Sequence, residues 1–79
     1  MSVEFELDAC GLFCPEPVIK TRQELDKMKE NETLEILADD PAAEADIRSL
    51  VKHLGNKVLS VSKDEDVTHI IIKKTKKKE

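Results

Sequence analysis

Apolar and polar side chains alternate at the start of the chain and then change their period. Val3, Phe5 and Leu7 alternate with acidic residues, and this period of two predicts a half-buried strand over residues 3–8. Farther along, the apolar stripe has helical spacing and consists of Val18, Ile19, Leu25 and Met28. We therefore predict a helix over about residues 15–29, followed by a turn.

The next part of the chain predicts a second strand and a second helix. Alternating apolar residues predict a strand over residues 33–38. Asp40 then precedes Pro41, so we expect an acidic N-cap with proline at the first helical position, where a missing N–H is harmless. The apolar stripe of this helix is Ala43, Ile47, Leu50, Val51 and Leu54. Gly55 is expected to end the helix.

The remaining apolar runs predict two strands, over residues 56–62 and 67–73, joined as a hairpin through residues 63–66. The predicted order is therefore βαβαββ. Right-handed crossovers would place both helices on one face of a four-stranded mixed sheet, which gives an α+β two-layer sandwich. With 79 residues, we expect a single domain over residues 1–72 and a lysine-rich end over residues 73–79.

Charge divides the chain into an acidic body and a basic end. Residues 1–72 hold eight Lys and Arg against sixteen Asp and Glu, a net charge of −8, whereas residues 73–79 hold five Lys and one Glu. Such a body repels nucleic acid and suits a protein partner with a basic surface. The lysines at the end are candidates for contact with a polyanion, but no aromatic side chains accompany them, so we expect a solvated end.

The sequence also indicates a compartment. No stretch approaches the ~18 apolar residues of a membrane span, and the first eight residues lack the pattern of a signal peptide. We therefore expect a cytoplasmic protein. Because thiols stay reduced there, Cys10 and Cys14 are interpreted as free, reactive or metal-binding side chains and not as a structural disulfide.

Cys14 stands where the first strand gives way to the first helix. We predict that it is the N-cap and that its sulfur accepts from the N–H of Glu16, since Pro15 and Pro17 have no N–H. Together with the helix dipole this would lower the pKa of the thiol, although the Glu16 carboxylate opposes the effect. The plainer alternative is a small buried cysteine beside prolines that only start the helix. Gly11 is expected to adopt a backbone conformation that a side chain would resist.

The run from Leu7 to Pro17, LDACGLFCPEP, resembles the L-D-x-x-G-L-x-C-P-x-P signature of the TusA-like (SirA-like) sulfur-carrier family, and Asp39-Asp40-Pro41 is similar to its second marker. The resemblance covers residues 7–72. It implies the two-layer fold and a Cys14 that carries sulfur as a persulfide. It also implies a donor such as a cysteine desulfurase or a rhodanese-like protein, and a downstream acceptor, for example in tRNA thiolation, cofactor biosynthesis or sulfur oxidation.

The other residues leave several interpretations open. Cys10 either ends the first strand as a small apolar residue or attacks a Cys14 persulfide as a resolving thiol. Asp39 and Asp40 either cap the second helix or form an acidic docking point, and we favour the cap. A metal site of Cys10, Cys14, His53 and His69 is disfavoured by their spacing, so no metal or cofactor is expected.

The function expected is thus that of a sulfur carrier acting with partner proteins, because the chain has no Cys-His pair or phosphate-binding loop typical of a self-contained enzyme. Two alternatives remain. One is a regulatory or nucleic-acid-binding module, which should spread basic residues over a surface. The other is a two-cysteine redox or selenium-related protein, which requires both thiols within disulfide reach.

Overall fold

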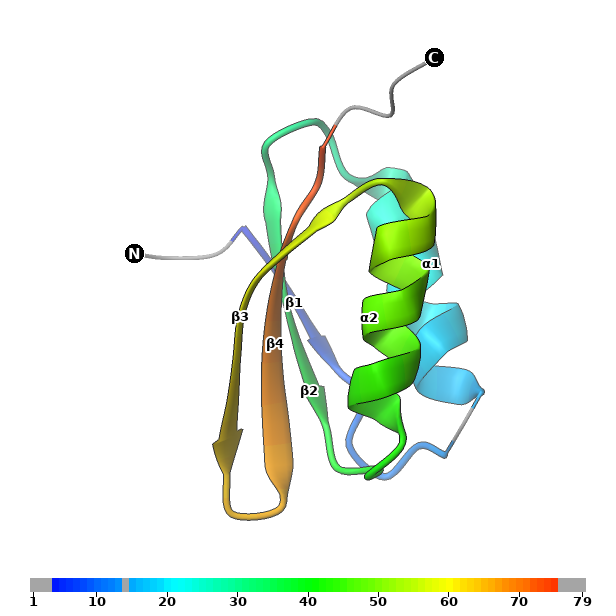
Figure 1. Ribbon diagram of the computed structural model, residues 1–79, viewed down its shortest axis with the longest axis vertical. Helices are drawn as coiled ribbons and strands as arrows, with labels where there is room; N and C mark the ends of the chain where they lie inside the picture. The colour runs from blue at the N-terminus through cyan, green and yellow to red at the C-terminus, as the bar shows by residue number, and fades with distance from the viewer. Residues whose placement is uncertain (1–3, 14, 76–79) are drawn as a thin grey trace.

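The computed structural model describes residues 4–13 and 15–75. Its elements follow the predicted order (Figure 1): β1 (Phe5–Asp8), α1 (Glu16–Lys27), β2 (Thr33–Ala38), α2 (Ala43–Leu54), β3 (Lys57–Asp64) and β4 (Val67–Lys73). Among these residues no helix is long and apolar enough to cross a membrane.

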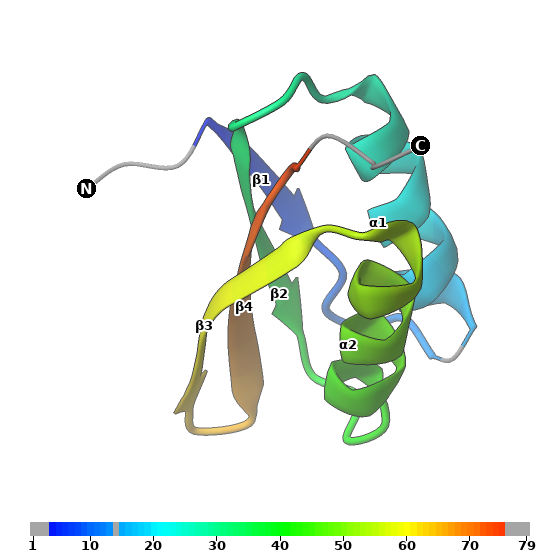
Figure 2. The same ribbon diagram turned by 45° about the horizontal axis from the view of Figure 1, so that its top comes forward.

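The strands form one mixed sheet in the order β1-β2-β4-β3. β1 runs parallel to β2, and β4 lies antiparallel to both β2 and β3. Both helices cover the same face of this sheet, as the two views of the ribbon agree (Figures 1 and 2). The predicted α+β two-layer sandwich is therefore confirmed.

The core lies between the sheet and the helices and is almost wholly aliphatic. Alternate residues of the two central strands are buried, as the period of two predicts: Leu34, Ile36, Ala38, Ile70 and Ile72. Leu25 of α1 and Ile47 and Val51 of α2 pack against them. The other face of the two central strands is partly buried and mixes polar side chains, Glu35 and His69, with the apolar Leu37 and Ile71.

The buried face of α1 differs from the predicted stripe. Pro17, Thr21 and Leu25 are its buried residues, whereas Ile19 is 49% exposed. Thr21 tolerates burial because its hydroxyl donates to the Pro17 carbonyl at 2.7 Å. The inward face of α1 thus includes Thr21, a polar residue that the apolar pattern does not predict to be buried. Met28 is buried but belongs to the C-cap, so the helix is shorter than predicted.

The start of α2 also differs from the prediction. The N-cap is Ala42, and no side chain caps the helix. The Asp40 carboxylate accepts from the Ala42 N–H at 3.0 Å, and the Asp40 carbonyl accepts from the Ala43 N–H at 2.9 Å. Asp40 and Pro41 therefore form a turn before the helix, because aspartate readily binds the N–H two residues ahead. Gly55 ends the helix with φ +81°, as expected.

The hairpin is longer and its turn tighter than predicted. β3 continues to Asp64, so only Glu65 and Asp66 connect it to β4, and Glu65 adopts φ +57°. The register shifts between Val58 and Ser60, which leaves the intervening Leu59 43% exposed.

The first residues of the lysine-rich end, Lys73 to Thr75, are part of the folded domain. The amine of Lys74 donates to the Leu25 carbonyl near the end of α1, and the Lys74 N–H donates to the Glu32 carbonyl at 2.8 Å. The Thr75 N–H donates to the Asn56 side chain at 3.0 Å, beside the end of α2. The expectation of a solvated lysine is thus wrong for Lys74. Lys76, Lys77 and Lys78 lie outside the described residues.

Gly11 has the predicted special conformation, with φ +83° between β1 and α1. No atom lies within 4 Å of the position that a Cβ would occupy, so a side chain there meets backbone strain and no steric clash.

We predict that Gly11→Val lowers the free energy of unfolding by about 1–2 kcal/mol, because positive φ is unfavourable for a residue with a Cβ. Gly11→Asn is the matched control and should lose less, since asparagine tolerates positive φ. Urea denaturation of the three proteins measures the effect. Equal stability of the valine variant and the parent would contradict the role of Gly11.

Candidate functional site

Cys14 itself lies outside the described residues, but the helix start after it is described. The N-cap of α1 is Pro15, one residue beyond the predicted position. The N–H of Glu16 donates to the Phe13 carbonyl at 2.8 Å. The predicted cap, in which this N–H binds the Cys14 sulfur, is therefore wrong. The physical reason is that the chain closes a turn on its own carbonyl, which is a better acceptor than a thiol.

The helix start consequently offers few hydrogen-bond donors to an anion. Pro15 and Pro17 have no N–H, and the Glu16 N–H is used within the turn. The carboxylate of Glu16 lies in the first turn of α1, as the sequence predicts. The positive end of the α1 dipole still favours an anion at this helix start. The negative charge of Glu16 weakens that effect.

The loop before Cys14 is held by acceptors from two elements. The Ala9 N–H donates to the Leu37 carbonyl at 2.7 Å, which extends the β1–β2 ladder past the end of β1. The next two N–H groups bind carboxylates: Cys10 donates to Asp8 at 3.0 Å and Gly11 to Asp39 at 2.9 Å. This part of the loop is thus fixed before it reaches the C-P-E-P run.

Asp39 therefore has a role that was not predicted. It caps no helix, and its carboxylate joins two segments that are 28 residues apart in the sequence. These segments are the ones singled out by the resemblance, LDACGLFCPEP and DDP. The presence of both motifs in one sequence was the available signal. Only the parallel pairing of β1 with β2 shows that Asp39 lies next to Gly11.

Cys10 lies in a turn, two residues beyond the end of β1, and is half-buried. The interpretation that it ends the strand is therefore wrong. Burial raises the pKa of its thiol above the usual value, and a hydrogen bond with Asp8 and the charges of Asp8 and Asp39 raise it further. A raised pKa leaves less of the Cys10 thiol as thiolate, which is the reactive form.

An open groove beside Cys10 is strongly acidic. Its lining consists of Asp8, Cys10, Leu37, Asp64, Glu65, Asp66, Val67 and His69. It contains residues from the ends of β1 and β2 and from the β3–β4 hairpin, so the sheet brings these carboxylates together. Such a surface repels anions and attracts basic groups.

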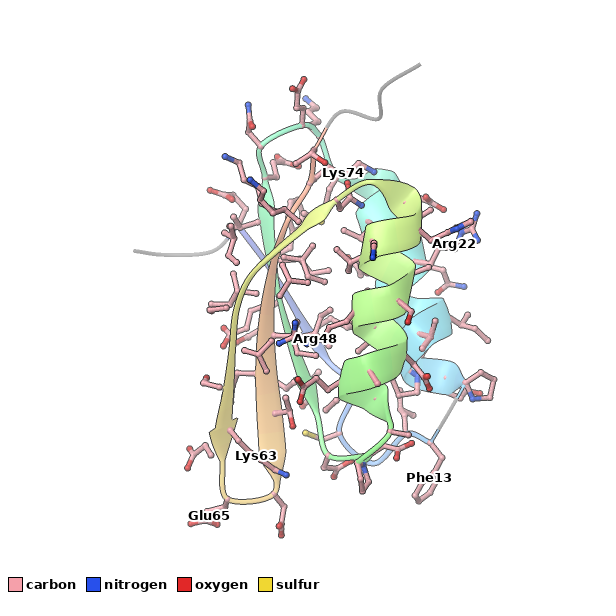
Figure 3. The ribbon with its side chains drawn as sticks, in the orientation of Figure 1. Phe13, Arg22, Arg48, Lys63, Glu65 and Lys74 are labelled. Carbon is pink, nitrogen blue, oxygen red and sulfur yellow. The ribbon has the colours of Figure 1, made fainter. Side chains whose placement is uncertain are left out.

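Apolar side chains are exposed on and beside the segment that contains Cys14 in the sequence. Phe13 is 77% exposed and points outward from the loop (Figure 3). A second groove, between α1 and α2, has Pro15, Val18 and Leu50 among its lining residues. The apolar pattern assigned Val18 and Leu50 to the buried stripes of the two helices, whereas the structure places both at this groove. The pattern made no prediction for Phe13.

The two histidines lie apart from each other. His69 on β4 pairs with Glu35 on β2, with 3.1 Å between Nδ1 and Oε2, whereas His53 lies late in α2, beside the α1–α2 groove. Within residues 4–13 and 15–75, no three His, Cys, Asp or Glu side chains are grouped so as to hold a metal ion.

Comparisons with known proteins agree with this fold. The family model described as Sulfurtransferase TusA matches residues 5–74. A protein of Archaeoglobus fulgidus that is provisionally named a sulfur carrier is 46% identical over 69 residues, which is 86% of this chain and 90% of that protein. The sulfur carrier protein TusA of Allochromatium vinosum is 33% identical over 70 residues, 89% of this chain and 92% of that protein.

One relative is much longer. A protein of Aquifex aeolicus, also provisionally named a sulfur carrier, is 43% identical over 68 residues, which is 86% of this chain but 34% of that protein. Among solved structures, a SirA-like protein from Desulfitobacterium hafniense superimposes with a TM-score of 0.79 at 22% identity, covering 91% of this chain and 99% of the other. The likeness to that structure concerns the fold. The match over residues 5–74 and the identities to the curated relatives show that the chain belongs to the TusA family.

Proposed function

We propose that this protein carries sulfur as a persulfide on Cys14 and passes it to an acceptor protein. The observation that carries the proposal is the family match over residues 5–74, which includes the C-P-E-P run. Membership of the family supports a sulfur-carrier role in general, and curated relatives bear that name. The raised pKa of Cys10 favours Cys14 as the working thiol.

The transfer needs no cofactor or external oxidant. The Cys14 thiolate attacks the outer sulfur of a donor persulfide, the S–S bond of the donor breaks, and the donor leaves as a thiolate. The same exchange, with the carrier now as donor, moves the outer sulfur to the acceptor. The chain thus acts as a sulfurtransferase relay with its partners and not as a self-contained enzyme.

The surface supports protein partners of a particular charge. We propose a cytoplasmic cysteine desulfurase or rhodanese-like protein as donor and an acceptor in tRNA thiolation or a related route. The acidic groove beside Cys10 suits a basic partner surface, and the exposed Phe13 supplies apolar contact area. A direct contact with nucleic acid has less support, since Lys74 is engaged within the fold.

We predict that Cys14 gains one sulfur atom when the protein is incubated with a cysteine desulfurase and cysteine, because an exchange-active thiolate is all that loading requires. Intact-mass spectrometry should show the added mass in the parent and in Cys10→Ser but not in Cys14→Ser. The opposite pattern would move the site to Cys10. No added mass in any protein, with several donors tried, would contradict the carrier function.

We also predict that Cys14 alkylates severalfold faster than Cys10 at neutral pH, because the thiolate is the reactive form and the pKa of Cys10 is raised. The alkylation rate at Cys10 should increase at a higher pH than the rate of an unperturbed cysteine, because the pKa of Cys10 is raised. Iodoacetamide kinetics on Cys10→Ser and Cys14→Ser provide the measurement. Equal rates in the two variants would show that the surroundings do not select Cys14.

A third prediction concerns docking. Raising the salt from about 0.1 M to about 1 M shortens the Debye length from about 10 Å to about 3 Å, so kcat/KM for sulfur transfer should fall while kcat changes little. Alkylation of Cys14 by uncharged iodoacetamide serves as the control and should be insensitive to salt. A salt-independent kcat/KM would exclude electrostatic docking.

A further inference from the structure

One face of the sheet carries both helices, and the other face keeps apolar side chains that no described helix covers (Figures 1 and 2). On β4 the residues that alternate with the core positions include Val67, His69 and Ile71, and Leu37 of β2 lies opposite His69. Leu37 is therefore diagonal to Val67 and to Ile71, so these three apolar side chains are neighbours. All three are only partly buried. Because an open sheet face is commonly polar, such an apolar strip indicates a surface that another protein covers.

Carboxylates from the two edge strands flank the apolar strip. β1 and β3 are the outer strands in the order β1-β2-β4-β3. Asp8 of β1 lies opposite Leu37, and Asp64 of β3 lies opposite Val67. Neighbouring strands are about 4.8 Å apart, so β1 and β3 are separated by roughly 14 Å, with the apolar side chains between them. Across the strands the face is thus acidic, then apolar, then acidic again.

This part of the face forms one open groove of about 530 Å³. Its lining includes both carboxylates, Leu37, Val67 and two further carboxylates of the hairpin, and among the described residues that line it there is no lysine or arginine. His69 also lines the groove and is paired with Glu35 at 3.1 Å. A cationic group in the groove therefore meets carboxylates on both sides, whereas an anion is repelled.

The groove reaches the loop that leads from β1 to α1. Cys10 belongs to its lining, and the Cys10 N–H donates to Asp8 at 3.0 Å. The next N–H, that of Gly11, donates to Asp39 at 2.9 Å. A partner in the groove therefore contacts a fixed part of the loop, within the run that carries the family signature.

We propose that this open face of the sheet docks a basic segment of a protein that exchanges sulfur with the chain. The inference deepens the proposed function and rests on it. The segment presents an apolar side chain to Leu37 and Val67, and on either side a lysine or arginine that pairs with Asp8 or Asp64. Arginine fits best, because its planar fork matches a carboxylate.

Charge complementarity selects this occupant over the others. A second copy of the chain would bring the same carboxylates to the face, and nucleic acid would bring phosphates, so both are repelled. A protein segment with separated cations and an apolar centre matches the acidic, apolar and acidic order across the strands.

The first test maps where a basic probe binds. The probe is a five-residue peptide with arginine at both ends, leucine at its centre and serine between them. Its extended form places the two arginines on one side about 13 Å apart, close to the separation of β1 and β3. In an NMR titration we expect saturable shifts at the amides of β1, β2 and the β3–β4 hairpin. Shifts should be much smaller for the peptide with glutamate at both ends and for the peptide with serine at its centre. No shifts, or shifts confined to other surfaces, overturn the proposal.

The second test asks whether the position of the charge matters. Asp64→Asn should weaken binding of the arginine peptide by about two- to fivefold at low salt, because one exposed ion pair is lost. Asp26→Asn, at an exposed position of α1, removes the same charge elsewhere and is the matched control, with unchanged affinity expected. Equal affinities for the two variants would show attraction by net charge alone and overturn the proposal.

A transfer measurement connects the face to sulfur exchange. After loading by a cysteine desulfurase, the protein is mixed with the arginine peptide extended by one cysteine. The peptide thiolate attacks the outer sulfur of the persulfide, and the carrier leaves as a thiolate. Transfer should be severalfold faster than to the glutamate counterpart, and Asp64→Asn should reduce this preference. Peptide binding without any preference in transfer overturns the assignment of the face to sulfur exchange.

These measurements separate the inference from the proposed function. If the parent never gains sulfur, the carrier function is wrong, while the titration still decides whether the face binds basic segments. If the parent gains sulfur but the peptide does not bind at the groove, the carrier function stands and the docking surface is wrong.

Discussion

The pairing of β2 with its neighbours is the interaction on which the rest of the structure depends. β2 pairs with β1 on one side and with β4 on the other, and its alternate residues Leu34, Ile36 and Ala38 are fully buried. The ladder between β1, an edge strand, and the central strand β2 continues through the Ala9 N–H, so the loop leading to Cys14 begins with a hydrogen bond to β2. The position of the loop is therefore a consequence of core formation.

The site combines opposing electrostatic effects. The dipole of α1 favours an anion at its start, whereas Glu16, Asp8, Asp39 and the hairpin carboxylates disfavour one nearby. Cys10 lies among these carboxylates, whereas Cys14 stands in the sequence after three intervening residues and just before α1.

Patterns with a local cause were predicted well. The alternation in β2 and β4 and the stripe of α2 identified their elements, because burial of one face requires the matching period. Gly11 and Gly55 were placed correctly, since positive φ is a local demand of the backbone. Two of the errors lie where a competing local bond exists: Glu16 binds Phe13 in place of a sulfur, and Asp40 forms a turn in place of a cap.

The sequence by itself determined the order of the elements, the two-layer class, the acidic body and the family signature from Leu7 to Pro17, since each depends on residues close together in the chain. Only the tertiary structure decided that Asp39 binds Gly11, that Lys74 binds the end of α1, that Cys10 is partly buried among carboxylates and that Phe13 and Ile19 are exposed. These features depend on strand order and register, which bring together residues that are far apart in the chain.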